Sequence, residues 1–189
     1  IIGKVIGFGG RVVDSETMPK YLNSPETPIF QKSNFLYGLN SAKNNVGQER
    51  RIIVVEGYMD VISLYQNGIK NVVASLGTSL TEQHAKLLTR YASEIFIAYD
   101  ADAAGRAATL RGLELFSSAS SNVRIVQFPG GYDPDEFIVK NGKKVFLDKI
   151  QQAPLLIDYK IMLAKQQNDL DTTEGKIQFV RKIISVLKK

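Results

Sequence analysis

Short runs of β-branched and apolar residues alternate with helical segments through the middle of this sequence, and this alternation constrains the fold more than any other feature. Arg51–Val55 (RIIVV) is a continuous strand-like run, and similar runs follow at Val72–Leu76, Ile95–Tyr99 and Val123–Phe128. Apolar strands separated by helices and brief loops are typical of a parallel sheet that is covered on both faces. We therefore predict an α/β fold with flanking helices.

The segments between these runs carry helix signals. Tyr58–Gln66 has helical spacing of its apolar residues and ends at Asn67-Gly68, where glycine can adopt a positive φ. Thr81 is the predicted N-cap of a helix that begins at Glu82, and residues 103–116 are rich in Ala and Leu. The sequence thus predicts a helix after each of the first three strands.

The regions on either side differ from this central unit. Residues 1–50 combine glycines, prolines and polar turns with short apolar stretches, which indicates a separate subdomain with strands. Residues 51–152 form the central α/β unit, and residues 153–189 contain two helical segments that look like the start of a helical subdomain. Because the chain opens at Ile1 within patterned sequence, we expect it to be a piece of a longer polypeptide.

Composition excludes several kinds of site. The chain has no cysteine and a single histidine, His84, so any metal must be held by oxygen atoms. No apolar run approaches the ~20 residues of a membrane span, and no signal peptide is apparent, so we expect a cytoplasmic protein without membrane contact. The net charge of +5 comes from the flanks, residues 1–50 and 153–189. This distribution suits a polyanionic ligand, but +5 is an ordinary charge for this size, so charge alone favours ordinary surface lysines.

Acidic residues follow three of the four predicted strands. Glu56 follows the first strand, Asp100 and Asp102 follow the third, and Asp133 and Asp135 come after the fourth. Ligands bind at the carboxyl edge of open α/β sheets, and side chains two residues apart in extended backbone point the same way. Clustered carboxylates repel one another unless a cation lies among them, and oxygen ligands suit magnesium or manganese. The pattern therefore predicts a divalent-metal site.

Each of these features also has a structural interpretation. An acid after a strand is more often a helix N-cap or a solvated loop residue, and turn chemistry explains much of the Asp133 and Asp135 pattern. This alternative is weaker for Glu56, which lies between an apolar strand and Gly57. The loop at residues 76–79 opens a helix, so its backbone N–H groups could meet a phosphate, or it is a simple glycine turn.

The segments after the strands together resemble the Toprim domain. VVEGYMD, ASLGTSLT, YDADAAGRAA and DPDEF carry the resemblance, and upstream IGFGGR and PKYLNSPETPIF extend it. Along its whole length the chain is similar to the RNA polymerase core of bacterial DnaG-type primases. The resemblance implies a Toprim-like parallel sheet at residues 51–152, preceded at residues 1–50 by the C-terminal part of a basic, mixed α/β subdomain and followed at residues 153–189 by the start of a small helical subdomain.

The resemblance also implies a chemistry. It implies a catalytic core that synthesises short RNA primers from ribonucleoside triphosphates by metal-dependent nucleotidyl transfer on single-stranded DNA. Glu56, Asp100 and Asp102 would bind catalytic Mg²⁺, for which Mn²⁺ can substitute, and no zinc is expected in this fragment. Asp60, Asp133 and Asp135 match further acids near the metals. The nucleotide- and template-binding face would comprise Arg11, Lys20, Tyr21, Asn23 and Lys32, to which the loop adds Gly77 and Thr78.

The implied partners are a single-stranded DNA template, ribonucleoside triphosphates, an RNA primer and, at the bacterial replication fork, the replicative helicase. We expect the helicase to be contacted through a domain absent from this chain, and we expect the zinc-ribbon domain of the family to be absent too. The alternative function is a nuclease-type or a non-catalytic Toprim module that binds nucleic acid. A non-catalytic module would show eroded carboxylates, and all of them are present here.

Overall fold

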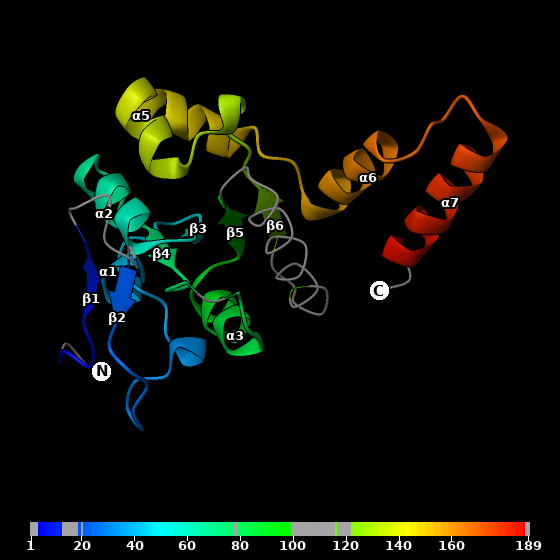
Figure 1. The fold of residues 1–189 in the computed structure, drawn as a ribbon. Coiled ribbons are helices and arrows are strands. Elements are labelled where there is room, and N and C mark those ends of the chain that lie inside the picture. Colours follow the sequence, from blue (N-terminus) through cyan, green and yellow to red (C-terminus); the bar gives the residue numbers. More distant parts are fainter. Residues whose placement is uncertain are drawn as a thin grey trace.

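The centre of the molecule is a four-stranded parallel sheet. The computed structural model describes residues 4–12, 19, 21–77, 79–99, 116 and 122–187. All neighbouring strands of this sheet are parallel, as the sequence predicts (Figure 1). The strand order is β4-β3-β5-β6, and the strands are β3 (Arg51–Val55), β4 (Val72–Ala74), β5 (Glu94–Ile97) and β6 (Asn122–Ile125).

Side chains of the central strands alternate between two apolar layers, as the pleat of a strand requires. Ile53 and Val55 of β3 pack on the face covered by α2 (Tyr58–Gln66) and α5 (Pro134–Gln151). Ile52 and Val54 of the same strand point to the opposite face. Because both faces are covered, β3 is apolar at every position after Arg51 and is buried from Ile52 onward.

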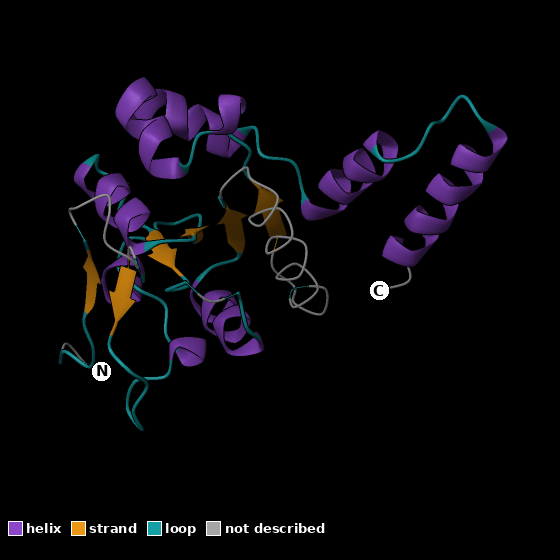
Figure 2. Ribbon diagram, viewed as in Figure 1, coloured by secondary structure: helices purple, strands orange, loops and turns teal. Residues whose placement is uncertain are grey.

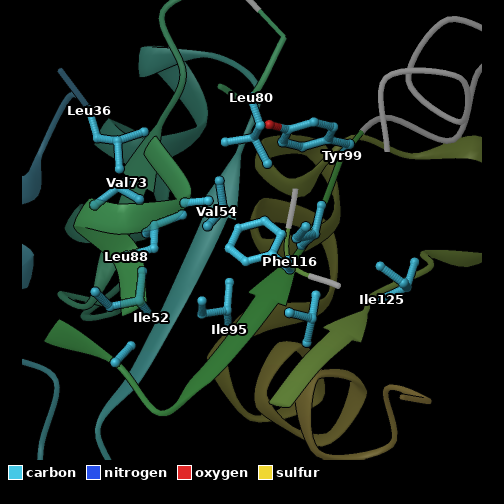
Figure 3. Close-up of a cluster of buried hydrophobic side chains, with 14 of the residues drawn as sticks. Leu36, Ile52, Val54, Val73, Leu80, Leu88, Ile95, Tyr99, Phe116 and Ile125 are labelled. Atoms are coloured by element: carbon cyan, nitrogen blue, oxygen red, sulfur yellow. The ribbon is translucent and has the colours of Figure 1, made fainter. Parts of the chain in front are cut away.

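The second face is covered by α1 (Leu39–Ala42), α3 (Glu82–Tyr91) and part of α6 (Leu156–Gln166). Figure 3 shows this layer, in which Tyr99 lies beside Leu80 above the end of the sheet. Tyr99 and Leu80 are each nearly fully buried. This apolar layer therefore extends to the carboxyl edge of the sheet, where the strands end.

The N-terminal region forms a separate two-stranded antiparallel sheet, β1 (Gly9–Arg11) with β2 (Tyr21–Asn23), followed by the short helix η1 (Lys32–Asn34) (Figure 2). Tyr37 then pairs with Ala74 through two backbone hydrogen bonds of 2.9 and 3.1 Å. This pairing covers the β4 edge, and a bridge between Arg124 and Leu155 covers the β6 edge.

A charged network fastens the amino-terminal ends of the strands. Glu94 accepts hydrogen bonds from Arg51 at 2.5 Å and from Arg124 at 2.7 Å. Glu94 begins β5, whereas Arg51 and Arg124 belong to the neighbouring strands β3 and β6. Burial raises the pKa of Glu94, but the hydrogen bonds and charges of the two arginines outweigh it and lower that pKa overall.

The chain ends in α6, which packs against the second face through Tyr159, and α7 (Thr173–Leu187), which lies farther from the sheet (Figure 1). Ile177, Val180 and Ile184 of α7 are exposed by 42 to 51%. Within the part of the chain that the structure describes, no helix is long and apolar enough to cross a membrane.

Most of the predicted elements are confirmed, with small shifts at their ends. The helices at Tyr58–Gln66 and Glu82–Tyr91 match the prediction, and Gly68 adopts φ 81° after the first of them. The last three strands end two or three residues earlier than predicted, at Ala74, Ile97 and Ile125. The predicted helix at residues 103–116 lies outside the described residues except for Phe116, which is buried in the core.

Candidate active site

Glu56 lies at the carboxyl edge of the sheet, directly after the inner strand β3. Its side chain is half-buried, and Ser75 follows the neighbouring strand β4. Tyr99 comes two residues after β5, the other neighbour of β3. Burial raises the pKa of Tyr99, the nearby Ser75 hydroxyl opposes this effect, and the negative charge of Glu56 raises the pKa further. Residues that follow three adjacent strands therefore converge here.

Asp100 and Asp102, the other two predicted metal ligands, lie outside the described residues. Asp100 directly follows Tyr99 in the sequence. Among the residues that the structure does describe, no group of three His, Cys, Asp or Glu side chains could hold a metal ion. The donors predicted for the site are all carboxylates, which suit a hard divalent cation such as Mg²⁺.

Asp60 supports the loop that carries Glu56. It lies in the first turn of α2, is only 8% exposed, and its Oδ2 accepts a hydrogen bond from the Gly57 N–H at 3.0 Å. A carboxylate at this position satisfies a backbone donor that a helix N-terminus leaves open and interacts favourably with the helix dipole. Asp60 thereby fixes the backbone immediately after Glu56.

Asp133 and Asp135 lie at the start of α5. Asp133 is the N-cap of this helix, and its Oδ1 accepts a hydrogen bond from the Glu136 N–H at 2.7 Å. Asp135 is in the first helical turn and is half-buried. The geometry of Asp133 agrees with the helix-capping interpretation. A position of Asp133 and Asp135 near the metals stays a prediction.

The β1-β2 hairpin brings together three residues of the predicted nucleotide- and template-binding face. Arg11 lies opposite Tyr21 in the register, and its guanidinium is 5.5 Å from the centre of the Tyr21 ring, a cation–π contact. Asn23 lies opposite Gly9. Lys20 of the same face lies outside the described residues.

Tyr58 connects this hairpin to the Glu56 loop, a link that the sequence analysis did not predict. The Tyr58 hydroxyl donates to the Gly10 carbonyl at 2.6 Å, and the ring meets Tyr21 edge-on at 5.4 Å. Burial raises the pKa of Tyr58, so the hydroxyl stays protonated as the donor. Since Tyr58 comes two residues after Glu56, one aromatic side chain joins the acidic and basic halves of the site. The sequence signal that could have identified Tyr58 is its position at the start of a helix, two residues after the candidate ligand Glu56.

A cavity of about 600 Å³ lies between the hairpin and α2. Arg11 and Asn23 contribute polar groups to its wall, whereas Lys32 is not among the lining residues. The apolar part of the wall comes from Phe8, Val12, Phe30, Tyr37, Tyr58, Met59, Ile62 and Leu76. A mostly apolar hollow with a few convergent polar groups is the usual form of a small-molecule site.

The loop after β4 has an unusual backbone at two consecutive residues. Leu76 adopts φ 58° and Gly77 adopts φ 73°. The conformation is ordinary for glycine but strained for leucine, and such strain often accompanies functional sites. Leu76 reaches the cavity wall, a position that nothing in its sequence context indicates. Thr78, the next predicted binding residue, lies outside the described residues.

Three family models match successive parts of the chain. Residues 1–43 match the family described as DNA primase catalytic core, N-terminal domain, and residues 53–138 match one described as Toprim-like. Residues 157–189 match a family described as DnaB-helicase binding domain of primase. This last match contradicts our expectation that helicase-binding sequence is wholly absent from the chain.

Curated relatives and solved structures are similar over nearly the whole chain. A DNA primase of Clostridium acetobutylicum is 55% identical over 99% of this chain, and one of Escherichia coli K12 is 45% identical over 92%. The chain spans only 31% and 30% of these relatives. A DNA primase domain from Pseudomonas aeruginosa has a TM-score of 0.85 at 43% identity, covering 94% of this chain and 56% of that one. A DnaG primase catalytic domain bound to single-stranded DNA has a TM-score of 0.83 at 43% identity, covering 94% and 58%.

Proposed function

The chain belongs to the DnaG-type family of bacterial primases, and from this membership we propose that it is the Toprim-containing core of a DNA-directed RNA polymerase that makes primers. Its substrates would be ribonucleoside triphosphates, and its template would be single-stranded DNA. The similarity to a primase catalytic domain bound to single-stranded DNA supports this choice of template.

One observation carries the proposal. The hairpin that carries Arg11 and the segments that follow β3 and β4 meet at one cavity, whose wall includes Arg11, Tyr58 and Leu76. Glu56 is not among the lining residues, but it lies two residues before Tyr58. Tyr58 follows the Glu56 loop, and Leu76 follows β4. A nucleotidyl transfer site needs this combination, because a triphosphate must be held by cationic groups while a metal ion contacts its oxygens. The apolar wall would suit a base or a sugar.

Glu56, Asp100 and Asp102 would hold Mg²⁺, with Mn²⁺ able to replace it. When bound, the metal would lower the barrier to attack of a primer 3′ hydroxyl on an α-phosphorus by neutralising charge on the reacting oxygens. Glu56 would contribute a half-buried carboxylate. The backbone next to Glu56 is held by the hydrogen bond that the Gly57 N–H donates to Asp60. The metal roles of Asp60, Asp133 and Asp135 remain part of the proposal.

Arg11, Lys20, Asn23 and Lys32 would hold the phosphates of the nucleotide and the template, and Tyr21 would orient Arg11 through the contact between guanidinium and ring. The backbone N–H groups of the loop at residues 77–78 would add donors for a phosphate. Lys and Arg neutralise phosphate charge without reading sequence, so this face would position nucleic acid rather than select its bases.

We also propose a division of the chain into three parts and a partner for the last of them. Residues 1–50 would complete a basic subdomain, residues 51–152 the Toprim domain, and residues 153–189 the start of a helical subdomain. The match of residues 157–189 to a helicase-binding family supports a contact with the replicative helicase through α6 and α7. The protein would act in the bacterial cytoplasm at the replication fork.

Primer extension tests the proposed function. The 189-residue chain is incubated with a short RNA primer annealed to single-stranded DNA, labelled ribonucleotides and Mn²⁺. We expect the primer to lengthen, and we expect a chelator to stop it. Nicks in labelled DNA without extension would instead indicate a nuclease-type Toprim enzyme. Binding of single-stranded DNA without extension or nicking would indicate a binding module.

Replacing Arg11 by Ala should weaken binding of single-stranded DNA and reduce its salt dependence. Each phosphate contact releases about one counterion, so the slope of log affinity against log salt should fall by about 0.7 for single strands. The measurement is fluorescence anisotropy of a labelled oligonucleotide between low and moderate salt. Arg90→Ala is the matched control, since it removes an exposed arginine near the end of α3 and should leave the slope unchanged. An unchanged slope in Arg11→Ala would assign Arg11 a structural role only.

A further inference from the structure

The only histidine of the chain is fully buried and joins two segments that are far apart in sequence. His84 is the third residue of α3 and is 0% exposed. Its Nε2 lies 2.8 Å from the Lys32 carbonyl oxygen and 3.1 Å from that of Phe35, while its Nδ1 lies 3.4 Å from the Thr81 backbone nitrogen. The imidazole ring therefore lies between the start of α3 and the η1 turn.

These partners fix the proton on the ring. Two carbonyl oxygens face Nε2, so Nε2 must carry the hydrogen and donate it. The Thr81 N–H faces Nδ1, so Nδ1 must accept. Burial lowers the pKa of His84, although the two carbonyl contacts oppose this effect. His84 is thus a neutral ring that donates to η1 on one side and accepts from α3 on the other.

A second contact strengthens the same junction. The Thr81 hydroxyl donates to the Ser33 carbonyl at 2.6 Å, so the first turn of α3 binds three carbonyls of the segment between Lys32 and Phe35. On its other side, the Lys32 backbone N–H donates to Glu26 at 3.1 Å. The backbone of Lys32 is held through both its N–H and its carbonyl oxygen.

The segment whose carbonyls are bound by Thr81 and His84, residues 32–35, follows shortly after a residue that lines the cavity. Phe30, two residues before Lys32, is 6% exposed and lines the cavity. A lysine ammonium is a point charge on a flexible stem, so the region it can reach depends on where its backbone is fixed. A shift of the η1 backbone would therefore change which phosphate oxygens Lys32 can reach.

We propose that His84 is a positioning residue that fixes the Lys32 backbone so that the Lys32 ammonium meets the triphosphate of the incoming nucleotide. This inference rests on the proposed function, in which Lys32 contacts the nucleotide. His84 itself touches no substrate. Its action passes through the Lys32 and Phe35 carbonyls.

Three variants separate this role from simple packing. In His84→Gln the side-chain amide places an N–H close to the position of Nε2, so the donation to the carbonyls can persist. In His84→Asn the shorter amide can still accept from the Thr81 N–H, as Nδ1 does, but cannot reach the carbonyls. Lys32→Ala removes the ammonium and leaves the backbone junction in place.

The test measures backbone order and nucleotide affinity in the same proteins. Hydrogen exchange reports on the amides of residues 33–36, and calorimetry gives the affinity for adenosine triphosphate with Mg²⁺. We expect His84→Asn to speed exchange and to weaken binding about 5-fold, since loss of one buried hydrogen bond typically changes an equilibrium by roughly that factor. His84→Gln should stay within about 2-fold of wild type, and Lys32→Ala should lose at least as much affinity as His84→Asn.

The outcomes distinguish the inference from the proposed function. Faster exchange with unchanged affinity in His84→Asn, beside weakened binding in Lys32→Ala, would overturn the positioning role alone. Unchanged affinity in Lys32→Ala would overturn the proposed role of Lys32, and the inference with it. If His84→Asn does not fold, Thr81→Val replaces it, because it removes the hydroxyl donated to Ser33. Weakened binding in that variant supports the inference, and unchanged affinity contradicts it.

Discussion

Replacing Glu56 by Gln should lower the rate of RNA primer extension by at least about 100-fold while the protein stays folded. Substitution of groups that merely support a metal ligand commonly costs 10- to 100-fold in activity or metal affinity, so the loss of a ligand should cost no less than roughly the upper figure. Gln keeps the shape of Glu but not its charge, and the half-buried position of Glu56 limits replacement of that charge by solvent. Single-turnover extension with saturating Mn²⁺ measures the effect.

Glu49→Gln is the matched control for this variant. Glu49 lies just before the other end of the same strand, is 68% exposed and pairs with Arg51, so neutralising it changes the net charge equally without touching the carboxyl edge. Near-normal extension in Glu49→Gln with loss in Glu56→Gln would support the metal site. Retained extension in Glu56→Gln would remove Glu56 from the catalytic ligands.

Replacing Phe146 by Ala should lower the free energy of unfolding by about 3–5 kcal/mol, the usual cost of truncating a fully buried aromatic ring. Phe146 of α5 is 0% exposed and stacks on Phe128 with 5.5 Å between ring centres. Its ring is tilted against that of Phe137, with 6.4 Å between ring centres. These rings hold α5 against the sheet. Alanine would leave a cavity that rigid neighbouring strands cannot close.

Urea denaturation followed by circular dichroism measures this loss. The free energy of unfolding should fall with urea concentration at the same slope in the variant and the wild type, which checks two-state unfolding. Val139→Ala in the same helix is the control, because Val139 is 70% exposed and such surface changes are usually within about 0.5 kcal/mol. A loss below about 1 kcal/mol in Phe146→Ala would show that the aromatic cluster does not anchor α5.

The same helix connects stability to the candidate site. Asp133 caps α5, and Asp135 lies in its first turn, so the anchoring of the helix fixes where both carboxylates stand. Gly142, at φ 78° and ψ 168°, interrupts α5 between this N-terminal half and the half that carries Phe146. Packing in the second half reaches the first half across that break and through the contact between the Phe146 and Phe137 rings.

Sequence periodicity by itself determined the layers of this protein and the place of Glu56 at the carboxyl edge of the sheet. A strand buried on both faces must be apolar at nearly every position, and Arg51–Val55 shows this directly. Strands that run parallel must end at one edge, so the residues after them were predictable as site candidates. The end of one helix at Gln66 and the start of the next at Glu82 followed from Asn67-Gly68 and from the Thr81 cap, signals that act over three or four residues.

Only the tertiary structure decided which distant residues act together. The hydrogen bond from Tyr58 to Gly10 and the contacts of His84 with the Lys32 and Phe35 carbonyls join residues far apart in the sequence, so no local pattern identifies the partners. The reason is physical: propensities and periodicity arise from neighbours within a few residues, whereas these contacts span up to 52 positions and exist only once the chain has closed.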